Sequence, residues 1–339
     1  MNAIPRRALG RGGLRLPVLG FGAAAIGNLY AAVDDAEAQD AVRAALDAGL
    51  SYFDTAPHYG FGLSETRLGA VLPAGAQVST KVGRVLVPCP HADGERHGFV
   101  DAAPFEPVFD YSHDGVMRSF EASLKRLGRD QVDVLLAHDL GAVTHGADHP
   151  RRLRQFLDGG YRAMRDLRDS GAVGAIGLGV NEWRVCEEIL GHADLDVVLL
   201  AGRYTLLEQT ALDSFLPLCA ARGVTVIVGG PFNSGVLVEG GARPAHYDYA
   251  PAPAAILERV RRLEAVCADH GAPLAAVALQ FPLAHGQVVS VIPGIASRAQ
   301  ALQAVSWLNT PLPDALWSDL RRAGLLHPDA PTPCIGVPA

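Results

Sequence analysis

Eight short apolar runs alternate with longer amphipathic stretches along the 339 residues, and this alternation constrains the fold more than any other feature. Runs rich in Val, Ile and Leu are typical of strands in a parallel sheet, because both faces of such a sheet are buried. The predicted strands cover residues 18–23, 50–56, 77–82, 132–139, 172–180, 195–202, 224–230 and 288–294. The predicted helices cover residues 34–49, 114–128, 151–171, 254–271 and 297–308.

Eight repeated strand–helix units predict a (β/α)8 barrel (TIM barrel) of the α/β class, folded as a single domain over residues 1–339. A doubly wound sheet is the alternative architecture. Its phosphate-binding fingerprint of three spaced glycines is missing, because Gly20 and Gly22 are followed by Ala25 and no helix opens there. The barrel is therefore the preferred fold, and functional residues are expected where its strands end.

Two segments exceed the usual length of a loop. Residues 83–112 follow the third predicted strand, residues 231–253 follow the seventh, and both are rich in Pro, Gly, His and aromatic residues. Long irregular segments are uncommon in compact domains unless they have a function. We expect both segments to overhang the face of the barrel that carries the strand ends.

The composition excludes several classes of function. A formal net charge of −7 gives no basic field for nucleic acid. Five widely spaced cysteines without a C-x-x-C pair indicate reduced thiols rather than a disulfide framework or a zinc site. The chain has no charge-free apolar run of about 18 residues, and Arg15 and Pro17 interrupt its N-terminal apolar stretch. We expect a cytoplasmic protein without nucleic-acid or membrane partners; the sequence does not predict an oligomeric state.

Polar side chains stand at the ends of consecutive predicted strands. Asp54 ends the second strand and Tyr59 follows it, Lys81 lies in the third, His138 lies in the fourth, and Asn181 follows the fifth. An ammonium inside an apolar run is costly to desolvate unless a carboxylate is near, and the neighbouring Asp54 is the expected partner of Lys81. These residue types predict an active site at the strand ends.

Each residue also has a structural interpretation. Asp54 could cap a helix, Lys81 could extend to solvent, and an isolated His138 is more often a hydrogen-bonded core residue. Complementary chemistry on three consecutive strand ends favours function. A noncatalytic protein that binds a cofactor is an alternative, since barrels host many functions. A zinc hydrolase is a weaker one: Asp139 adjoins His138, but no other strand end carries a histidine, so no metal is predicted.

The motifs DTAPHYG, STKVG, LLAHD and GLGVNE resemble those of the aldo-keto reductase family in order and near spacing, over about residues 14–326. The stretches FDTAPHYGFGLSETRLG and YDYAPAP are similar to the bacterial branch of D-threo-aldose 1-dehydrogenases and L-fucose dehydrogenases, and a pyridoxal 4-dehydrogenase-like branch is also similar. The resemblance implies an NAD(P)-dependent oxidoreductase that oxidises an aldose at C1 to the lactone. Oxidation of pyridoxal, or reduction of another aldehyde or ketone, is the alternative. The implied catalytic residues are Tyr59, Lys81, Asp54 and His138, with Asn181 binding the nicotinamide.

The implied reaction moves a hydride between a carbinol carbon and the nicotinamide, so the substrate oxygen needs a proton partner. A phenol with a pKa near 10 is a poor base at neutral pH. We expect Lys81 to lower the pKa of Tyr59 by roughly one to three units. Asp54 would keep Lys81 charged, and His138 would hydrogen-bond the substrate oxygen.

Cofactor binding is expected near the last strand, in VIPGIASRAQ. A helix beginning at Ser297 would offer backbone N–H groups and a positive dipole end to a dinucleotide phosphate, although an ordinary serine cap is equally consistent. NADPH-using members of the family carry a Lys and an Arg where this chain has Gly294 and Gln300. Their loss favours NAD, and Arg298 keeps NADP possible.

Three positions depart from the family pattern. Val180 replaces a serine, Ala201 replaces a glutamine, and a glycine in GGPFNSG replaces the aromatic residue that stacks on the nicotinamide. The alternatives at this last place are a cofactor contact and a plain glycine-rich turn. The candidates for the contact are Phe232, Asn233 and Ser234.

Substrate residues are expected on the segments that overhang the strand ends, where aromatic rings stack on sugar faces and polar tips bind hydroxyls. Loop packing is the alternative for each of them. The expected substrate is a small polyhydroxylated molecule. The candidates are His58, Arg84, Tyr204 and Tyr30, with Phe21 and residues 246–249 on the same terms.

Overall fold

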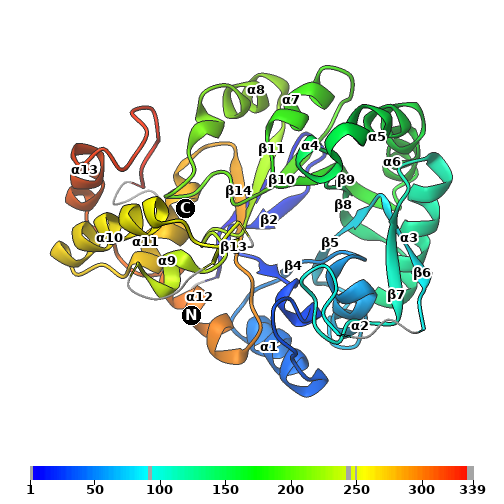
Figure 1. The fold of residues 1–339 in the computed structure, drawn as a ribbon, viewed down its shortest axis with the longest axis horizontal. Helices are drawn as coiled ribbons and strands as arrows, with labels where there is room; N and C mark the ends of the chain where they lie inside the picture. The colour runs from blue at the N-terminus through cyan, green and yellow to red at the C-terminus, as the bar shows by residue number, and fades with distance from the viewer. Residues whose placement is uncertain (1–2, 91–93, 242–245, 249, 334–339) are drawn as a thin grey trace.

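The computed structural model describes residues 3–90, 94–241, 246–248 and 250–333, and these form a parallel eight-stranded barrel (Figure 1). Strands adjacent in the chain order pair with one another, and parallel bridges from Leu19 to Val291 and from Gly22 to Gly294 join the first strand to the last. The expected (β/α)8 fold is therefore confirmed. The barrel strands are β3 (Phe21–Gly22), β4 (Tyr52–Asp54), β5 (Gln77–Val82), β8 (Val132–His138), β9 (Val173–Val180), β10 (Val197–Ala201), β11 (Thr225–Gly229) and β14 (Val288–Ile292).

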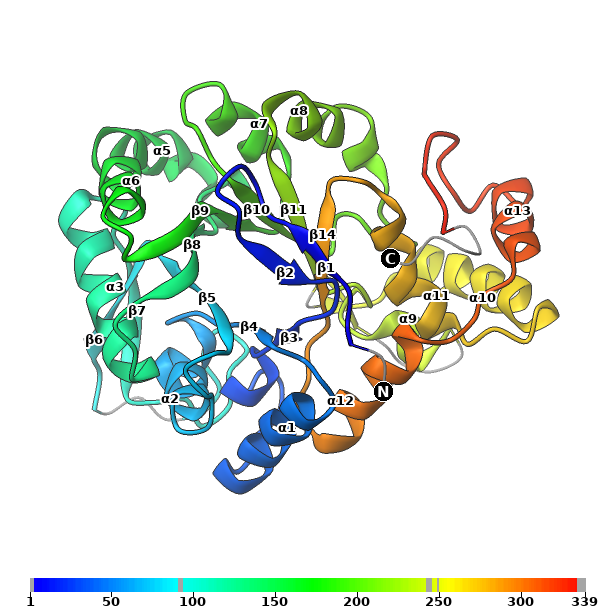
Figure 2. The same cartoon turned by 180° about the vertical axis from the view of Figure 1, so that it is seen from behind.

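Helices surround the barrel and cover its outer face (Figures 1 and 2). In the described residues no helix is both long and apolar enough to cross a membrane. The longer helices are α1 (Asp35–Asp47), α3 (His113–Leu127), α6 (Tyr161–Asp169), α8 (Phe215–Arg222), α10 (Ala254–Asp269), α12 (Arg298–Leu308) and α13 (Asp314–Arg322). The shorter ones are α2 (Leu63–Gly69), α4 (Ala142–His145), α5 (His149–Gln155), α7 (Arg184–Leu190), α9 (Val236–Glu239) and α11 (Leu274–Gln280).

The boundaries of α1 follow from its sequence. The Asp34 carboxylate accepts a hydrogen bond from the Glu37 N–H at 2.7 Å, which satisfies one of the free donors of the first turn. Gly49, two residues after the helix, adopts a φ of 93°, a conformation that side chains other than glycine rarely adopt. The predicted helix over residues 34–49 is thus present with its cap.

The predicted helix over residues 151–171 is wrong as a single α-helix. The chain forms α5 and α6, with a π-helical turn at Phe156–Gly160 between them. The two glycines that end this turn allow close packing: a Cβ on Gly160 would lie 2.4 Å from the Tyr111 carbonyl oxygen. The wider turn therefore lets this segment pack directly on the backbone of residues 111–113.

The two long segments follow β5 and β11, as their positions in the sequence indicate. The first contains an antiparallel hairpin of β6 (Arg84–Pro88) and β7 (Phe105–Phe109), and β6 packs beside α3. The second contains α9 and the two-residue strands β12 (His246–Tyr247) and β13 (Ala250–Pro251). Neither segment is a wholly irregular loop, because backbone pairing satisfies part of its hydrogen-bonding groups.

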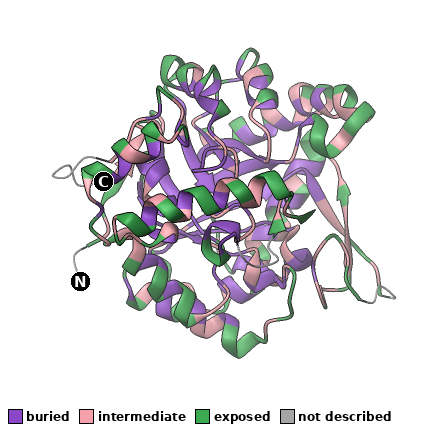
Figure 3. Ribbon diagram, turned by 60° about the vertical axis from the view of Figure 1, so that its left-hand side comes forward, coloured by how far each residue is buried: buried purple, intermediate pink, exposed green. Residues whose placement is uncertain are grey.

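The core has two layers. One cluster fills the barrel, and a larger one lies between the sheet and the surrounding helices. An N-terminal hairpin of β1 (Arg6–Ala8) and β2 (Arg15–Pro17) crosses the end of the barrel opposite the strand ends, and Leu9 and Leu16 join the interior cluster (Figure 2). Burial follows the strands and the inward helix faces (Figure 3). Side chains therefore close the end of the barrel at the amino ends of its strands, so a site can form only at the carboxyl ends.

Close packing inside the sheet gives a testable requirement at Gly177 in β9. A Cβ there would lie 1.8 Å from the Val197 carbonyl oxygen on β10, and backbone cannot move aside cheaply. We expect Gly177→Ala to lower the free energy of unfolding by about 1–3 kcal/mol or more. Urea unfolding would measure it. The exposed Gly75 has no atom within 4 Å of the point where a methyl group would stand, and Gly75→Ala is therefore the control. Equal stability of the two variants would contradict the packing argument.

Candidate active site

A cavity of about 680 Å³ lies at the carboxyl ends of the barrel strands, within the size range of small-molecule sites. Its wall includes Tyr59, Lys81, His138 and Asn181 from the predicted site. The loop after β3 adds Tyr30, and the first long segment adds its connection between β6 and β7. The structure thus brings distant parts of the sequence to one cavity.

Lys81 is the centre of the polar contacts in this cavity. Its Nζ donates to Asp54 Oδ2 at 2.7 Å, to the Thr55 carbonyl oxygen at 2.9 Å and to Tyr59 Oη at 3.2 Å. The exposed fractions of the Lys81 and Asp54 side chains are 1% and 3%. An ion pair this deeply buried is tolerable only because each charge is also hydrogen-bonded.

The neighbouring strands explain how Asp54 is aimed. Asp54 on β4 is in register with Ser79 on β5, whose hydroxyl donates to Asp54 Oδ1 at 2.7 Å. The Ser79 hydroxyl also hydrogen-bonds the Tyr52 hydroxyl at 2.8 Å. Both oxygens of the carboxylate are therefore occupied, and the side chain is fixed toward Lys81. Asp54 is not a helix cap here.

The pKa of Tyr59 differs from the expectation. Burial raises the pKa of Tyr59 well above 10, the negative charges of Asp54 and Asp139 raise it further, and only Arg84 opposes them. The expected lowering by Lys81 is wrong for this state, because the charge of Lys81 is already compensated by Asp54 at 2.7 Å. Tyr59 is consequently a neutral phenol in the free protein.

His138 is neutral as well. Burial lowers the pKa of His138 well below 6.5, and the positive charges of Arg84 and Lys81 lower it further. Its ring lies edge-on to the rings of Tyr59 and His58, with 5.9 Å between centroids in each case. A neutral imidazole beside a neutral phenol can hydrogen-bond an uncharged substrate oxygen without adding charge to the cavity.

A second buried ion pair lies on the other side of His138. Arg84, at the start of β6, donates from Nη2 to Asp139 Oδ2 at 2.6 Å. Asn181 Nδ2 donates to Asp139 Oδ1 at 3.2 Å. Arg84, predicted to bind substrate, is therefore engaged with a carboxylate. Asp139 was recognised in the sequence only as a neighbour of His138, although an acidic residue ending a buried strand is a signal in its own right.

The three candidates after β11 organise their own loop. Phe232 packs edge-on against Trp307 with 5.4 Å between ring centroids. Asn233 accepts from the Thr205 hydroxyl at 2.6 Å and donates to the Gly202 carbonyl at 3.0 Å. The Ser234 side chain hydrogen-bonds Tyr30. These contacts account for the three residues as structural supports, and their role in cofactor binding stays a prediction.

The candidates after β14 lie at the N-terminus of α12. Ser297 caps the helix, since its hydroxyl accepts from the Gln300 N–H, and the Gln300 side chain accepts in return from the Ala296 N–H at 2.7 Å. This pair resembles a capping box, except that Gln300 binds the N–H one residue before the cap. Gly294 is exposed, with open space where a side chain would be. Arg298 contacts both oxygens of Asp40 on α1, at 2.8 and 2.5 Å.

The substrate candidates divide into two groups. Tyr30 and His58 line the cavity, and His246 stacks on Tyr30 with 5.8 Å between ring centroids. The structure places Tyr204 in the hydrophobic core, against Phe281 and His285, because its ring is fully buried there. Phe21 is likewise a core residue, and Tyr249 lies outside the described residues.

Sequence reasoning missed the cavity roof formed by residues 95–99 of the first long segment, from which Glu95, His97 and Phe99 line the wall. The His, Pro and Gly content of that segment indicated a function, but it did not show which of its residues face inward.

Among the described residues, no group of three or more His, Cys, Asp or Glu side chains is arranged to hold a metal ion. The zinc hydrolase alternative would need such a group.

Comparison with known proteins agrees with this geometry. The sequence model of the Aldo/keto reductase family matches residues 18–324. The chain is 43% identical over 339 residues to a pyridoxal 4-dehydrogenase from Microbacterium luteolum, covering 96% of this chain and 99% of that protein. It is 38% identical over 335 residues to a D-threo-aldose 1-dehydrogenase from a Pseudomonas species, covering 95% and 97%.

Two solved structures share the fold. A glycerol dehydrogenase from Gluconobacter oxydans superposes with a TM-score of 0.72 at 22% identity, over 99% of each chain. The holo form of an aldo-keto reductase from Bacillus halodurans has a TM-score of 0.71 at 24% identity, over 94% of this chain and 96% of that one. At these identities the likeness concerns the fold alone.

The buried ion pair predicts how the site responds to mutation. Lys81→Met leaves the Asp54 carboxylate buried without its cation, so we expect the free energy of unfolding to fall by about 3–5 kcal/mol. Tyr59→Phe removes one hydrogen-bonding group from a partly buried ring and should cost only about 1 kcal/mol. Urea unfolding measures both. The chain's other lysine, the exposed Lys125, gives the control Lys125→Met. A Lys81→Met variant as stable as Lys125→Met would contradict the buried ion pair between Lys81 and Asp54.

Proposed function

We propose, from the premise that this chain belongs to the aldo/keto reductase family, that it oxidises a cyclic hemiacetal to a lactone, with NAD as hydride acceptor and Tyr59 as acid/base. That it is an NAD(P)-dependent oxidoreductase acting on a small molecule follows from the family. The observation that carries the finer proposal is the contact of Lys81 with both Asp54 and Tyr59 in one cavity with His138 and Asn181.

The chemistry of each residue follows from its contacts. The carbinol carbon of the substrate loses a hydride and its oxygen loses a proton, which leaves the carbonyl of the lactone. Tyr59 takes the proton as a base, and Lys81, which donates to Tyr59 Oη at 3.2 Å, stabilises the phenolate that must form first. An N–H of the neutral His138 holds the substrate oxygen beside the phenol. An oxidised nicotinamide, when bound, would accept the hydride and bring a positive charge that favours the phenolate.

The cavity suits a nicotinamide near Tyr59. Asn181 offers an amide to the carboxamide group, and the wall beside it is built from the small residues Gly179 and Ala201, which leave room for a flat ring. Gly294, which does not line this cavity, leaves open space near the N-terminus of α12. We assign the dinucleotide phosphates to this end, where Ser297 and the first backbone N–H groups of α12 would hold them.

An aldose of the L-fucose or D-threo type is the proposed substrate. In water an aldose closes to a hemiacetal whose C1 carbinol is the reacting group. Such a molecule has polar edges and an apolar ring face, and the cavity offers imidazole and carboxylate groups beside aromatic rings. These are His58, His97 and Glu95 beside Tyr30 and Phe99.

Pyridoxal is the second candidate, favoured by the 43% identity to a pyridoxal 4-dehydrogenase. Pyridoxal carries an aldehyde next to a hydroxymethyl group and also closes to a cyclic hemiacetal, so the same residues would perform the same oxidation. Its aromatic ring would pack against Phe99 and the neighbouring imidazoles. The two candidates thus differ in the substrate ring and not in the reaction.

The first experiment measures the absorbance of reduced nicotinamide with purified protein, NAD or NADP, and L-fucose, D-arabinose, L-galactose, L-rhamnose or pyridoxal. We expect NAD-dependent oxidation, reduced roughly 10²- to 10⁴-fold in Tyr59→Phe because the proton acceptor is lost. Tyr161→Phe, on the outer helix α6, is the control. Full turnover by Tyr59→Phe would exclude its catalytic role, and activity only with NADPH and simple aldehydes would exclude hemiacetal oxidation.

The contact between Arg298 and Asp40 supports NAD. A 2′-phosphate seeking the Arg298 guanidinium would meet the Asp40 carboxylate that already occupies it. We expect Asp40→Asn to raise kcat/KM for NADP relative to NAD by roughly two- to fivefold, because exposed ion pairs of this kind contribute up to about 1 kcal/mol. Glu37→Gln, exposed on the same helix, is the control. If the ratio of kcat/KM for NADP to that for NAD is the same in Asp40→Asn as in the parent, Arg298 does not influence the choice of cofactor.

A further inference from the structure

Asp139 is held in an unusual state at the cavity wall. Its φ is 50°, in the left-handed region that residues other than glycine enter at a cost. Its side chain is only 11% exposed, and burial raises the pKa of this carboxyl. Strained backbone and a buried charge in one residue persist only where the surrounding structure enforces them, and such residues cluster at functional sites.

The backbone at this point is fixed from behind. The Tyr111 hydroxyl donates to the His138 carbonyl oxygen at 2.6 Å and lies 3.0 Å from His145 Nε2. The Asp139 N–H donates to the Gly179 carbonyl oxygen at 2.9 Å, so the chain stays paired with β9 beyond the end of β8. These contacts hold the turn that aims the Asp139 carboxylate toward its partners.

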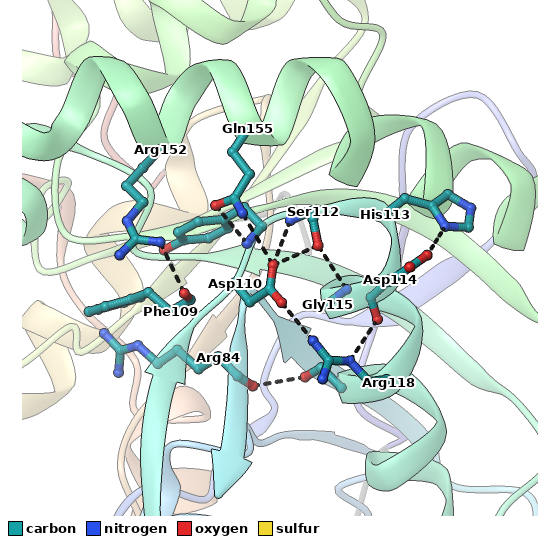
Figure 4. A network of polar contacts seen from close by, with 12 residues as sticks. Arg84, Phe109, Asp110, Ser112, His113, Asp114, Gly115, Arg118, Arg152 and Gln155 are labelled. Carbon is teal, nitrogen blue, oxygen red and sulfur yellow. Dashed lines mark hydrogen bonds and ion pairs between the residues drawn. The ribbon is translucent and has the colours of Figure 1, made fainter.

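Arg84 reaches Asp139 at a cost to stability. Its side chain is 8% exposed and its guanidinium lies 4.8 Å from the centre of the Phe109 ring. Figure 4 shows the two side chains next to each other. Nη2 contacts Asp139, while Nε and Nη1 have no hydrogen-bond partner among the described residues. A buried cation with unpaired N–H groups is poorly explained by stability, since an apolar pair of similar size is often as stable.

We propose that Arg84 and Asp139 form a buried positioning pair, in which Arg84 keeps the Asp139 carboxylate at the cavity wall and Asp139 sets the orientation of both His138 and Asn181. The inference rests on the proposed function, because it assigns these two residues a task in that reaction. Neither Arg84 nor Asp139 transfers a proton or a hydride in this scheme; both act through the residues that they hold.

The effect on His138 concerns its tautomer. A neutral imidazole carries one N–H, and its neighbours decide which nitrogen holds the proton. His138 Nε2 lies 3.5 Å from Asp139 Oδ2, too far for a full hydrogen bond but close enough for the negative charge to favour a proton on Nε2. That N–H is thereby present without being consumed, so it is available to a substrate oxygen.

The effect on Asn181 concerns its amide. Asp139 Oδ1 is an acceptor only, so it requires the amide nitrogen of Asn181 to face it, at 3.2 Å. The Asn181 carbonyl oxygen then faces away from Asp139. The Asp139 carboxylate thus orients both His138, proposed to hold the substrate oxygen, and Asn181, proposed to hold the nicotinamide. Loss or movement of this carboxylate would displace both.

A double-mutant cycle tests the pair by turnover. The variants are Arg84→Met, Asp139→Asn and the two combined, assayed with NAD and either L-fucose or pyridoxal. Asparagine suits the positive φ at this position, so the single variant adds no backbone strain. We expect each single variant to lower kcat/KM roughly 10²-fold through misplacement, and the combined variant to lower it no further. Losses that multiply in the combined variant would show independent roles and overturn the pair.

Arg118→Met is the matched control. Arg118 also pairs with an aspartate in the same region, donating to Asp110 at 2.7 Å (Figure 4), but its side chain is 62% exposed. Its removal should leave kcat/KM unchanged. A loss equal to that of Arg84→Met would mean that any ion pair around the hairpin matters, which would overturn the specific role of Arg84.

A second measurement does not depend on turnover. Nuclear magnetic resonance of protein labelled with ¹⁵N in its histidine rings reports the tautomer of His138, assigned by its absence in His138→Gln. We expect the Nε2–H tautomer in the parent, and a shift toward Nδ1–H both in Asp139→Asn and in Arg84→Met, because Arg84→Met releases the Asp139 carboxylate from the partner that holds it. An unchanged tautomer in Asp139→Asn would overturn the proposal. If the parent oxidises neither substrate, the proposed function fails while this comparison still decides on Asp139.

Discussion

The ion pair between Lys81 and Asp54 imposes constraints on much of the barrel around it. Two charges with exposed fractions of 1% and 3% must be matched in place, and this requires β4 and β5 to keep a single register. Space must also be left for the lysine stem, and a Cβ on Gly179 of β9 would come within 3.0 Å of Lys81 Cε. The buried position of Lys81 therefore favours a glycine at position 179, although that residue lies on β9 and not on the strands of the ion pair.

The cavity wall carries little net charge, because its buried charges are paired with one another. Lys81 is paired with Asp54 and Arg84 with Asp139, while burial raises the pKa of Tyr59 and lowers the pKa of His138, so both of these side chains are neutral in the free protein. A phenol with a raised pKa keeps its proton until a positive charge arrives. In the proposed reaction, the positive charge of a bound oxidised cofactor would favour loss of the Tyr59 proton, so proton removal would be coupled to the presence of a hydride acceptor.

The sequence predicted those features that depend on local pattern. Strand β5 spans the predicted residues 77–82. Asp54, Tyr59, Lys81 and His138 meet because each stands at or just after a strand end, and parallel topology brings these ends to one face. Features that depend on tertiary packing were not predictable. The partner of Arg84 lies 55 positions away, the role of Tyr204 depends on which way a loop turns, and the first strand shortens from residues 18–23 to Phe21–Gly22. Hydrophobic periodicity carries no information about any of these.

In the proposed function, substrate choice and reaction would depend on different parts of the chain. The roof of residues 95–99 is tied to the loop after β3, since the Tyr30 N–H donates to the Gly98 carbonyl at 2.9 Å and the Val100 N–H donates to the Asn28 carbonyl at 3.0 Å. These contacts are between backbone groups, so part of the roof is held independently of its side chains. Arg96, which donates to the Phe105 carbonyl at 2.8 Å, and His97, which contacts Glu106 at 2.7 Å, also hold the roof in place. The buried pairs below allow no such freedom, because each charge needs its partner. One barrel could therefore keep the proposed hemiacetal oxidation while changes in its roof side chains adapt it to a sugar ring or a pyridine ring.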